Sequence, residues 1–362
     1  MAEGEEPGAV AAEPRSAVLK PFHFERHVTY YSRNMQMLPG FMASLDTNRA
    51  TLVFFCVSGL DLIHAPLQAE QRQHVIDWLY SLQVIPSSSE GVGGFRGSSH
   101  IGNPFCPDNG GSAPVCAYDG GHLAMTYTAL ALLGVLKADL SRIQRPALLR
   151  MLRAHQVASG SFVSNLGGGE EDMRFLYCAC TVATMIKGLD HVDAASATAF
   201  VQRCITHEGG IAQEPGLEAH AGSTYCAVAS LAMLGTLDEA LADGRRERLI
   251  EWLLQRQETG FNGRPNKLVD TCYSFWVGGS LAILGALQMA DQEQLFAYLH
   301  STESDMGGFA KHPGGYPDPL HAYMGLAGVA LWDTDQTKAL NPCMCDQQLG
   351  SVQESDVLAL GA

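Results

Sequence analysis

The organisation of this chain is clearest in residues 246–287, which read RERLIEWLLQRQETGFNGRPNKLVDTCYSFWVGGSLAILGAL. Apolar positions in 246–255 recur at helical spacing, which predicts an amphipathic helix. A glycine turn at 259–261 and a polar loop follow it. The second segment, 274–287, is rich in small residues and apolar nearly all round, which is typical of a buried helix. The stretch therefore predicts an outer helix, a turn and an inner helix.

The glycine turn recurs through the chain and ends each time on an aromatic or aliphatic side chain. The copies are Gly93-Gly94-Phe95, Gly160-Ser161-Phe162, Gly209-Gly210-Ile211, Thr259-Gly260-Phe261 and Gly307-Gly308-Phe309. The last four begin 49, 50 and 48 residues apart, and such a period indicates stacked supersecondary units. Period-two alternation is scarce, so we expect an all-α ring or solenoid. Its inner helices would begin at one mouth, and helix N-termini favour anions.

Length and composition indicate a sizeable core flanked by two tails. The chain has 362 residues, 46% of them apolar, which is enough for one large domain or two smaller ones. We expect residues 21–333 to form the repeat domain. Residues 1–20 are rich in Ala, Glu and Pro, which predicts a disordered N-terminal tail. Periodicity is lost after Trp332, so residues 334–362 are expected to form a loose C-terminal tail.

Charge and cysteine usage narrow the class of protein. The formal net charge of −15 argues against a nucleic-acid partner, because binding phosphates requires a basic surface. No apolar run reaches the length of about eighteen residues that a membrane span needs. The first residues have neither a basic nor an apolar signal region, and the ten cysteines follow no framework spacing. These features indicate reduced thiols and a cytoplasmic protein.

A carboxylate and a thiol stand close together at the start of one inner helix. Asp270 and Cys272 are separated by one residue, and His321 follows Cys272 by 49 residues, at nearly the same phase of the repeat. One carboxylate, one thiolate and one imidazole with a fourth position open describe a catalytic zinc site. The alternative is an Asp that caps the helix beside a buried Cys, which is the commoner role of such a pair.

Cations gather on the loops of two neighbouring repeats. Arg264 and Lys267 precede the inner helix, and His220 lies at the matching point of the preceding repeat. With Tyr273 they supply donors that can neutralise a diphosphate, and such charge-assisted bonds strengthen in a water-poor site. The alternative for any single cation is an ordinary surface role.

Arg174 lies at the position that corresponds to His220 in the repeat before it. It can reach an anionic group such as a peptide carboxylate, or it can pair with Asp172 or Glu171. Aromatic residues such as Phe275 and Trp276 are core residues by default. Those on inner helices near the mouth can instead line an apolar funnel.

Four segments together resemble a known family: 94–99 (GFRGSS), 172–175 (DMRF), 216–224 (GLEAHAGST) and 263–276 (GRPNKLVDTCYSFW). From about residue 22 to 333 the chain resembles the β subunits of protein prenyltransferases, and among them those of the type I geranylgeranyltransferases. The resemblance implies an α-α toroid and a heterodimer with a helical-repeat α subunit.

The resemblance also implies roles for individual residues. It implies zinc on Asp270, Cys272 and His321, and a peptide carboxylate near Arg174. The residues that it implies for substrate binding are His220, Ala221, Gly222, Arg264, Pro265, Asn266, Lys267, Tyr273, Ser274, Phe275 and Trp276. The implied reaction transfers a geranylgeranyl group from geranylgeranyl diphosphate to the cysteine of a C-terminal CaaX motif, with X usually Leu, on proteins such as small GTPases. Zinc would lower the thiol pKa so that a thiolate attacks the lipid.

Two positions distinguish the subfamilies. Where farnesyltransferases have a Trp at the floor of the lipid funnel, this chain has Thr51, which leaves room for a fourth isoprene unit. Where relatives have an Asp that helps to bind magnesium, this chain has Lys311, whose ammonium can replace the charge of the metal. The resemblance therefore implies that magnesium is not required.

Three other readings stay open, namely the β subunit of Rab geranylgeranyltransferase, that of farnesyltransferase, and a non-catalytic scaffold; terpene cyclases are set aside. Rab geranylgeranyltransferase and farnesyltransferase β subunits share much of the site. Terpene cyclases share the toroid, but their Asp-x-Asp-Asp motif is absent from this sequence. A non-catalytic helical-repeat scaffold would not require Asp270, Cys272 and His321 together.

Overall fold

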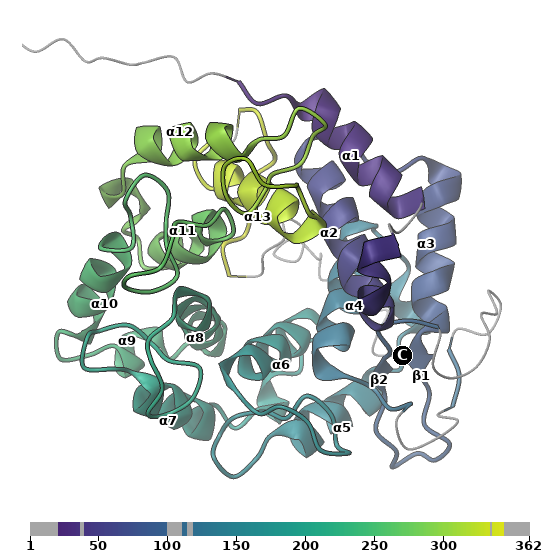
Figure 1. Cartoon of the computed structure of the whole chain (residues 1–362). Helices are drawn as coiled ribbons and strands as arrows, with labels where there is room; N and C mark the ends of the chain where they lie inside the picture. The colour runs from purple at the N-terminus through teal and green to yellow at the C-terminus, as the bar shows by residue number, and fades with distance from the viewer. Residues whose placement is uncertain (1–20, 37–39, 100–110, 114–118, 334, 344–362) are drawn as a thin grey trace, which may run out of the picture.

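A computed structural model describes residues 21–36, 40–99, 111–113, 119–333 and 335–343. Figure 1 shows these residues as a closed ring of helices in two layers. The tail that we expected over residues 1–20 lies outside the described residues, as does most of the second tail.

The inner layer within the described ranges is a circuit of six helices. They are α2 (Arg49–Leu62), α4 (Leu123–Val135), α6 (Met173–Met185), α8 (Ala221–Leu234), α11 (Tyr273–Ile283) and α13 (Pro319–Ala330). Each packs against the next in this order, and α13 packs against α2 to close the ring. Because neighbours or the outer layer cover these helices on most sides, they are apolar nearly all round, as the sequence of α8, AGSTYCAVASLAML, shows.

The outer layer covers the ring with amphipathic helices (Figure 1). These are α1 (Phe24–Gln36), α3 (Ala69–Ser81), α5 (Arg145–His155), α7 (Ala194–Cys204), α10 (Arg245–Leu254) and α12 (Gln292–Thr302). The short connecting elements are η1 (Gly40–Asn48), η3 (Leu140–Arg142), η4 (Leu189–His191), α9 (Leu237–Ala240) and η5 (Leu287–Met289). Two short antiparallel strands, β1 (Gln83–Val84) and β2 (Gly94–Phe95), pair Gln83 with Phe95.

One type of hydrogen bond joins the repeats at a single rim. An amide at the start of an inner helix donates to a carbonyl in the loop of the next repeat. These bonds are Ala50 to Gly97 (2.9 Å), Leu123 to Ser164 (2.8 Å), Met173 to Gln213 (3.1 Å), Ala221 to Gly263 (2.8 Å) and Thr271 to Lys311 (3.1 Å). The inner helices are therefore parallel, and their N-termini surround one mouth.

The glycine turns bring each repeat close to the outer helix of the next. Gly160 has φ +91°, and a Cβ there would lie 2.0 Å from the carbonyl oxygen of Ser196. Gly307 has φ +83°, and a Cβ would lie 2.1 Å from the carbonyl oxygen of Arg26. Only glycine permits both the left-handed backbone and this approach. The recurring glycines in the sequence are thus contacts between repeats.

The ring closes through a buried carboxylate. Glu303, at the end of α12, accepts hydrogen bonds from the His23 amide (2.7 Å) and from His27 Nε2 (3.1 Å). His27 Nδ1 in turn accepts from the Gly308 amide (3.0 Å). Burial alone would raise the pKa of Glu303, but the hydrogen bonds from His27 and His23 outweigh it and lower the pKa to about 2. The first and last parts of the ring are therefore joined by a charged group.

We expect Glu303→Gln to lower the free energy of unfolding at pH 7 by about 2 kcal/mol, because hydrogen bonds to an ionised acceptor are lost. A carboxylate with a depressed pKa stabilises the fold above its unfolded pKa, and this contribution is lost as the pH falls toward 2. The difference between parent and variant should therefore shrink between about pH 4.5 and pH 2 in denaturant titrations. The exposed Glu293→Gln on the same helix is the control. A difference that does not change with pH would contradict this role of Glu303.

The beginning of the C-terminal tail is packed against the ring, which corrects the expectation of a loose segment. The Lys338 amide donates to the carbonyl of Leu62 (3.0 Å), and Lys338 Nζ lies 2.5 Å from Asp61 Oδ1. Four residues later, the carbonyl of Pro342 accepts from the Tyr225 hydroxyl (3.0 Å). The sequence of this segment has no periodicity, and we therefore predicted a loose tail. Its contacts are tertiary, so they leave no local pattern in the sequence. None of the helices in the described ranges has the length and apolarity that a membrane crossing needs.

Candidate metal centre and anion site

Asp270, Cys272 and His321 meet at the mouth of the ring. One ligand atom from each lies within 4.8 Å of the others, and they are the only such group of three or more His, Cys, Asp or Glu among the described residues. Asp270 and Cys272 lie just before α11, and His321 lies in the first turn of α13. These two helices are neighbours in the ring, so the repeat phase brings together residues that are far apart in sequence.

Asp270 is held in a fixed position. Its Oδ1 accepts from the Cys272 amide (3.0 Å) and lies 3.2 Å from His321 Nε2. Burial would raise the pKa of Asp270, but the hydrogen bonds from His321 and Cys272 lower it to about 2. The carboxylate is therefore charged at neutral pH although it is buried.

His321 is oriented by a residue that the sequence analysis did not single out. Asp318 caps α13 by accepting from the His321 amide (3.0 Å), and its other oxygen lies 2.6 Å from His321 Nδ1. This contact leaves Nε2 directed at Asp270. Burial would lower the pKa of His321, but the bonds to Asp270 and Asp318 raise it to about 9. An Asp three residues before a ligand His, at a helix start, is the sequence signal that could have indicated it.

Cys272 is buried, and its thiol is protonated without a metal. Burial raises the pKa of the thiol well above its ordinary value, and the nearby Asp270 charge raises it further. Only the thiolate ligates metals well, so a bound cation would have to displace this proton. The combination of sulfur, nitrogen and oxygen donors, with His321 held by a carboxylate, fits zinc.

We expect one zinc ion per chain in active protein, and Cys272→Ala should lose it together with activity, by more than about 100-fold, because a direct ligand is removed. Elemental analysis and a transfer assay measure the two quantities. Cys180→Ala, which removes another buried thiol on α6, should keep both. Active protein without zinc would overturn the assignment of these three residues.

A hydrogen-bonded pair lies beside the triad. His220, which caps α8, accepts from the Gly222 amide at Nδ1 (3.0 Å), and its Nε2 lies 3.0 Å from the Tyr273 hydroxyl oxygen. Burial and the nearby Arg264 charge lower the pKa of His220, so the ring is neutral with its proton on Nε2. Nε2 therefore donates to Tyr273. Burial raises the pKa of Tyr273, so the hydroxyl keeps its proton and can donate it to an anion.

The loop before α11 carries two cations, and the charge of one of them, Arg264, acts on both members of this pair. Arg264 is partly exposed and pairs with Glu218 at 2.5 Å, and Lys267 is exposed. Asn266 between them has φ +61°, a backbone conformation that Asn tolerates better than most residues. Gly263 allows the loop to approach Tyr273, because a Cβ there would lie 2.2 Å from the ring. The loop thus brings the charge of Arg264 to the side of Tyr273, and Lys267 lies three residues further along the same loop.

Arg174 forms ion pairs, which is one of the two roles that the sequence analysis left open for it. Its guanidinium bonds to Asp172 (2.6 Å) and to Glu170 (3.2 Å), and not to Glu171 as we had considered. Its side chain is nevertheless 48% exposed, so it can still reach a ligand at the mouth. The hydrogen bond to Asp172 raises the pKa of Arg174.

Several residues that the sequence analysis named for substrate binding either form hydrogen bonds within the protein or are buried. The Ala221 amide donates to Gly263 and the Gly222 amide to His220, so neither is available to bind phosphate. Ser274 and Phe275 are fully buried. They point into the packing around α11. The sequence could not predict this, because a helix that is apolar all round gives no signal for the face that turns toward a ligand. Trp276 and Pro265 remain partly exposed.

Residues 22–346 match the family model described as the prenyltransferase alpha-alpha toroid domain. The chain is 34% identical to the geranylgeranyl transferase type-1 subunit beta of Dictyostelium discoideum over 332 residues, which cover 88% of this chain and 94% of that protein. It is 36% identical to the same subunit of Arabidopsis thaliana over 335 residues, 89% of this chain and 88% of that protein. The structure of Candida albicans protein geranylgeranyltransferase-I complexed with GGPP matches with a TM-score of 0.80 and 26% identity, covering 94% of this chain and 99% of that one.

The chain belongs to the prenyltransferase family. Within it, the chain groups with the geranylgeranyl transferase type-1 β subunits, which confirms the resemblance seen in the sequence. The α-α toroid expected from the repeats is confirmed as well.

The prenyltransferase ring carries a level of aromatic side chains below the mouth. Neighbouring inner helices place their rings 4.9–6.1 Å apart: Phe54 with Tyr127, Tyr127 with Tyr177, Tyr177 with Tyr225, Tyr225 with Trp276, and Phe54 with Tyr323 at 5.4 Å. Tyr177 and Tyr225 each follow the N-cap of their helix by five residues. We call this set the aromatic tier. Phe54, Tyr177, Tyr225 and Tyr323 are buried in it, and Tyr127 and Trp276 are partly exposed.

Thr51 and Lys311 lie at the mouth end of the prenyltransferase ring. Thr51 is in the first turn of α2, one turn before Phe54, and its hydroxyl lies 3.7 Å from Met125 Sδ. This places Thr51 at the mouth end of α2, and its role in lipid length stays a prediction. The Lys311 side chain is 56% exposed, and its Nζ lies 3.6 Å from Asp270 Oδ2, so its charge is beside the candidate metal ligands.

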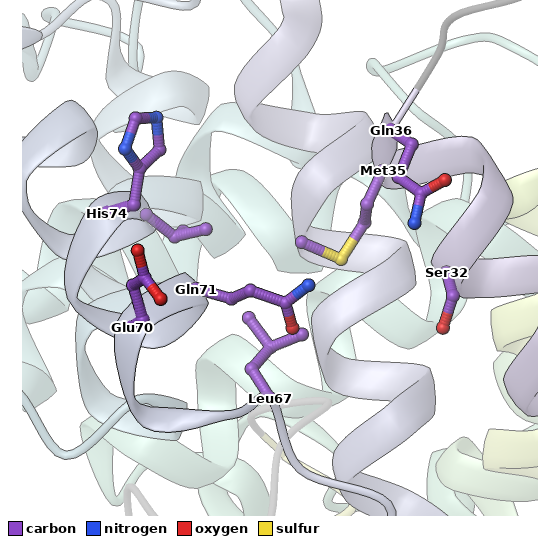
Figure 2. Close-up of a pocket in the computed structure, with 8 residues that line it drawn as sticks. Ser32, Met35, Gln36, Leu67, Glu70, Gln71 and His74 are labelled. Atoms are coloured by element: carbon purple, nitrogen blue, oxygen red, sulfur yellow. The ribbon is translucent and has the colours of Figure 1, made fainter.

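A separate cavity of about 320 Å³ lies on the outer layer, between α1 and α3. Figure 2 shows Gln71 and Leu67 facing Met35 across it. None of the candidate site residues lines this cavity. It therefore has no part in the site at the mouth.

Proposed function

We propose that this chain is the catalytic β subunit of a heterodimeric type I protein geranylgeranyltransferase. It would transfer the geranylgeranyl group from geranylgeranyl diphosphate to the cysteine of a C-terminal CaaX motif, with X usually Leu. The observation that carries the proposal is the Asp270–Cys272–His321 triad together with a His–Tyr pair that lies in the field of Arg264. The names of its type-1 relatives support the choice of lipid.

Asp270, Cys272 and His321 would hold a zinc ion, and Asp318 would keep His321 in the required orientation. A zinc ion there supplies a position at which the substrate thiol loses its proton near neutral pH. The buried Asp270 is charged before any cation arrives, and a divalent ion would displace the protons of His321 and Cys272 to reach all three ligands. The partly buried location also limits competition by water.

The diphosphate would lie against Tyr273, Arg264 and Lys267. When the bond between lipid carbon and oxygen breaks, negative charge develops on the diphosphate, and fixed donors that meet this charge lower the barrier. Tyr273 is positioned by His220, so its hydroxyl can donate to a diphosphate oxygen. Arg264 must exchange its contact with Glu218 for one with the ligand, which its partial exposure allows.

The lipid would enter the ring along the aromatic tier. An apolar chain buried there gains about 0.8 kcal/mol per carbon, so the five additional carbons of geranylgeranyl over farnesyl are worth up to ~4 kcal/mol. Thr51 leaves more room at the mouth end of the wall than a large side chain would. We further propose a helical α subunit as partner, CaaX proteins such as small GTPases as substrates, and a cytoplasmic location.

Co-expression with candidate α subunits tests this function. The heterodimer should transfer geranylgeranyl in preference to farnesyl, and to peptides that end in Leu in preference to Met. Thr51→Trp should lower the geranylgeranyl-to-farnesyl ratio of kcat/KM by at least about tenfold, because bulk at this wall removes the advantage of the longer lipid. Thr29→Trp, on the exposed face of α1, is the control. Farnesyl preference in the parent would refute the proposed function, and an unchanged ratio in Thr51→Trp would refute the role of Thr51.

We expect transfer to require zinc but not magnesium, because the Lys311 ammonium lies where it can meet the diphosphate charge. Activity should stay nearly flat as magnesium rises from zero to millimolar levels. Lys311→Asp should slow transfer about tenfold or more without magnesium and recover when it is added, because a carboxylate can ligate the ion. The exposed Lys187→Asp is the control. A strong magnesium requirement in the parent would exclude this role of Lys311.

A further inference from the structure

A carboxylate from the preceding repeat lies against one of the candidate diphosphate residues. Glu218 Oε2 is 2.5 Å from Arg264 Nη1, and the two side chains are 53% and 39% exposed. Glu218 lies two residues before His220, the N-cap of α8, and Arg264 lies in the loop before α11. The ion pair therefore joins the two loops that carry the anion site. Arg264 has a role in the proposed function, whereas Glu218 has none.

The backbone holds both members of this ion pair in place. The residue directly after Glu218 forms an antiparallel bridge with Ala212. The Ala221 amide donates to the carbonyl of Gly263 (2.8 Å), which directly precedes Arg264. The contact between the two side chains therefore follows from the register of the two repeats.

The charges of the ion pair reach the hydrogen-bond donors of the anion site. Burial lowers the pKa of His220, the Arg264 charge lowers it further, and the Glu218 charge opposes this shift. Burial raises the pKa of Tyr273, and the Arg264 charge opposes that rise. A diphosphate that accepts from Tyr273 thus lies within reach of the guanidinium that Glu218 occupies. The carboxylate and the diphosphate compete for the same cation.

We propose that Glu218 is a positioning residue that competes with the diphosphate for Arg264 and so promotes the release of the diphosphate product. This inference rests on the proposed function. In the empty site Glu218 keeps the guanidinium at the rim. A bound diphosphate draws it away, because it carries more charge and can accept two guanidinium donors at once. Once the bond to the lipid has broken, the product has lost its apolar anchor, and Glu218 can take Arg264 back.

The test measures the binding of inorganic pyrophosphate to the zinc-loaded heterodimer by calorimetry. Glu218→Gln removes the competing charge and keeps the size of the side chain, so the Kd of pyrophosphate should fall about twofold to fivefold, the range of an exposed ion pair. Glu214→Gln, in the same exposed loop, changes the net charge equally and should leave the Kd unchanged. Misfolding cannot tighten binding. An unchanged or higher Kd in Glu218→Gln would overturn the inference.

A double-mutant cycle shows whether Glu218 acts through Arg264. Arg264→Ala alone should weaken pyrophosphate binding by about tenfold or more, because a charge-assisted contact is lost. In that background Glu218→Gln should tighten binding no more than Glu214→Gln does. Equal tightening with and without Arg264 would mean that Glu218 only repels the anion, and it would overturn the competition for Arg264.

The release step is measured after a single turnover, with a pyrophosphatase and a phosphate sensor. Affinity changes within one interface lie mostly in the dissociation rate, so pyrophosphate should leave Glu218→Gln about twofold to fivefold more slowly than it leaves the parent. Equal release rates would overturn the role in product release. If the parent transfers no geranylgeranyl group at all, the proposed function fails, whereas transfer with none of these changes refutes only the role of Glu218.

Discussion

The hydrogen bond from the Thr271 amide to the Lys311 carbonyl joins two repeats at the point where the candidate metal ligands meet. Asp270 and Cys272 flank the donor, and His321 follows the acceptor by ten residues. Equivalent bonds recur around the rim, so the start of each inner helix is fixed by the loop of the following repeat. A site whose ligands come from two repeats can form only if this register holds. The closure of the ring at Glu303 keeps the last repeat in that register.

The electrostatics of the mouth follow from the same arrangement. Asp270 is buried and charged because His321 and the Cys272 amide bond to it. Cys272 keeps its proton because it is buried beside that charge. His220 is neutral, and it directs the hydroxyl of Tyr273 outward. The mouth thus offers carboxylate, thiol and imidazole ligands for a cation and, beside them, donors and cations for an anion, which is the pairing that diphosphate displacement by a thiolate requires.

Much of the fold and the metal triad could be predicted from the sequence, because both follow from the repeat. The glycine turns mark contacts between repeats, and His321 lies at the phase of Cys272. The orientation of Ser274 and Phe275 could not be predicted, since a helix that is apolar all round gives no signal for its exposed face. The position of Thr51 depends on the direction of α2, and the packing of residues 338–343 depends on tertiary contacts with Asp61 and Tyr225. Asp318 was missed although its spacing from His321 was visible.

The central claim is that the triad holds a metal with one position left for the substrate thiol. The most direct measurement is the absorption spectrum of the heterodimer with cobalt(II) in place of zinc, before and after a CaaX peptide is added. A peptide with Cys should increase the thiolate-to-cobalt band, because a second sulfur joins that of Cys272, and a peptide with Ser in its place should not. An unchanged spectrum with the Cys peptide, or equal changes with both peptides, would contradict the account.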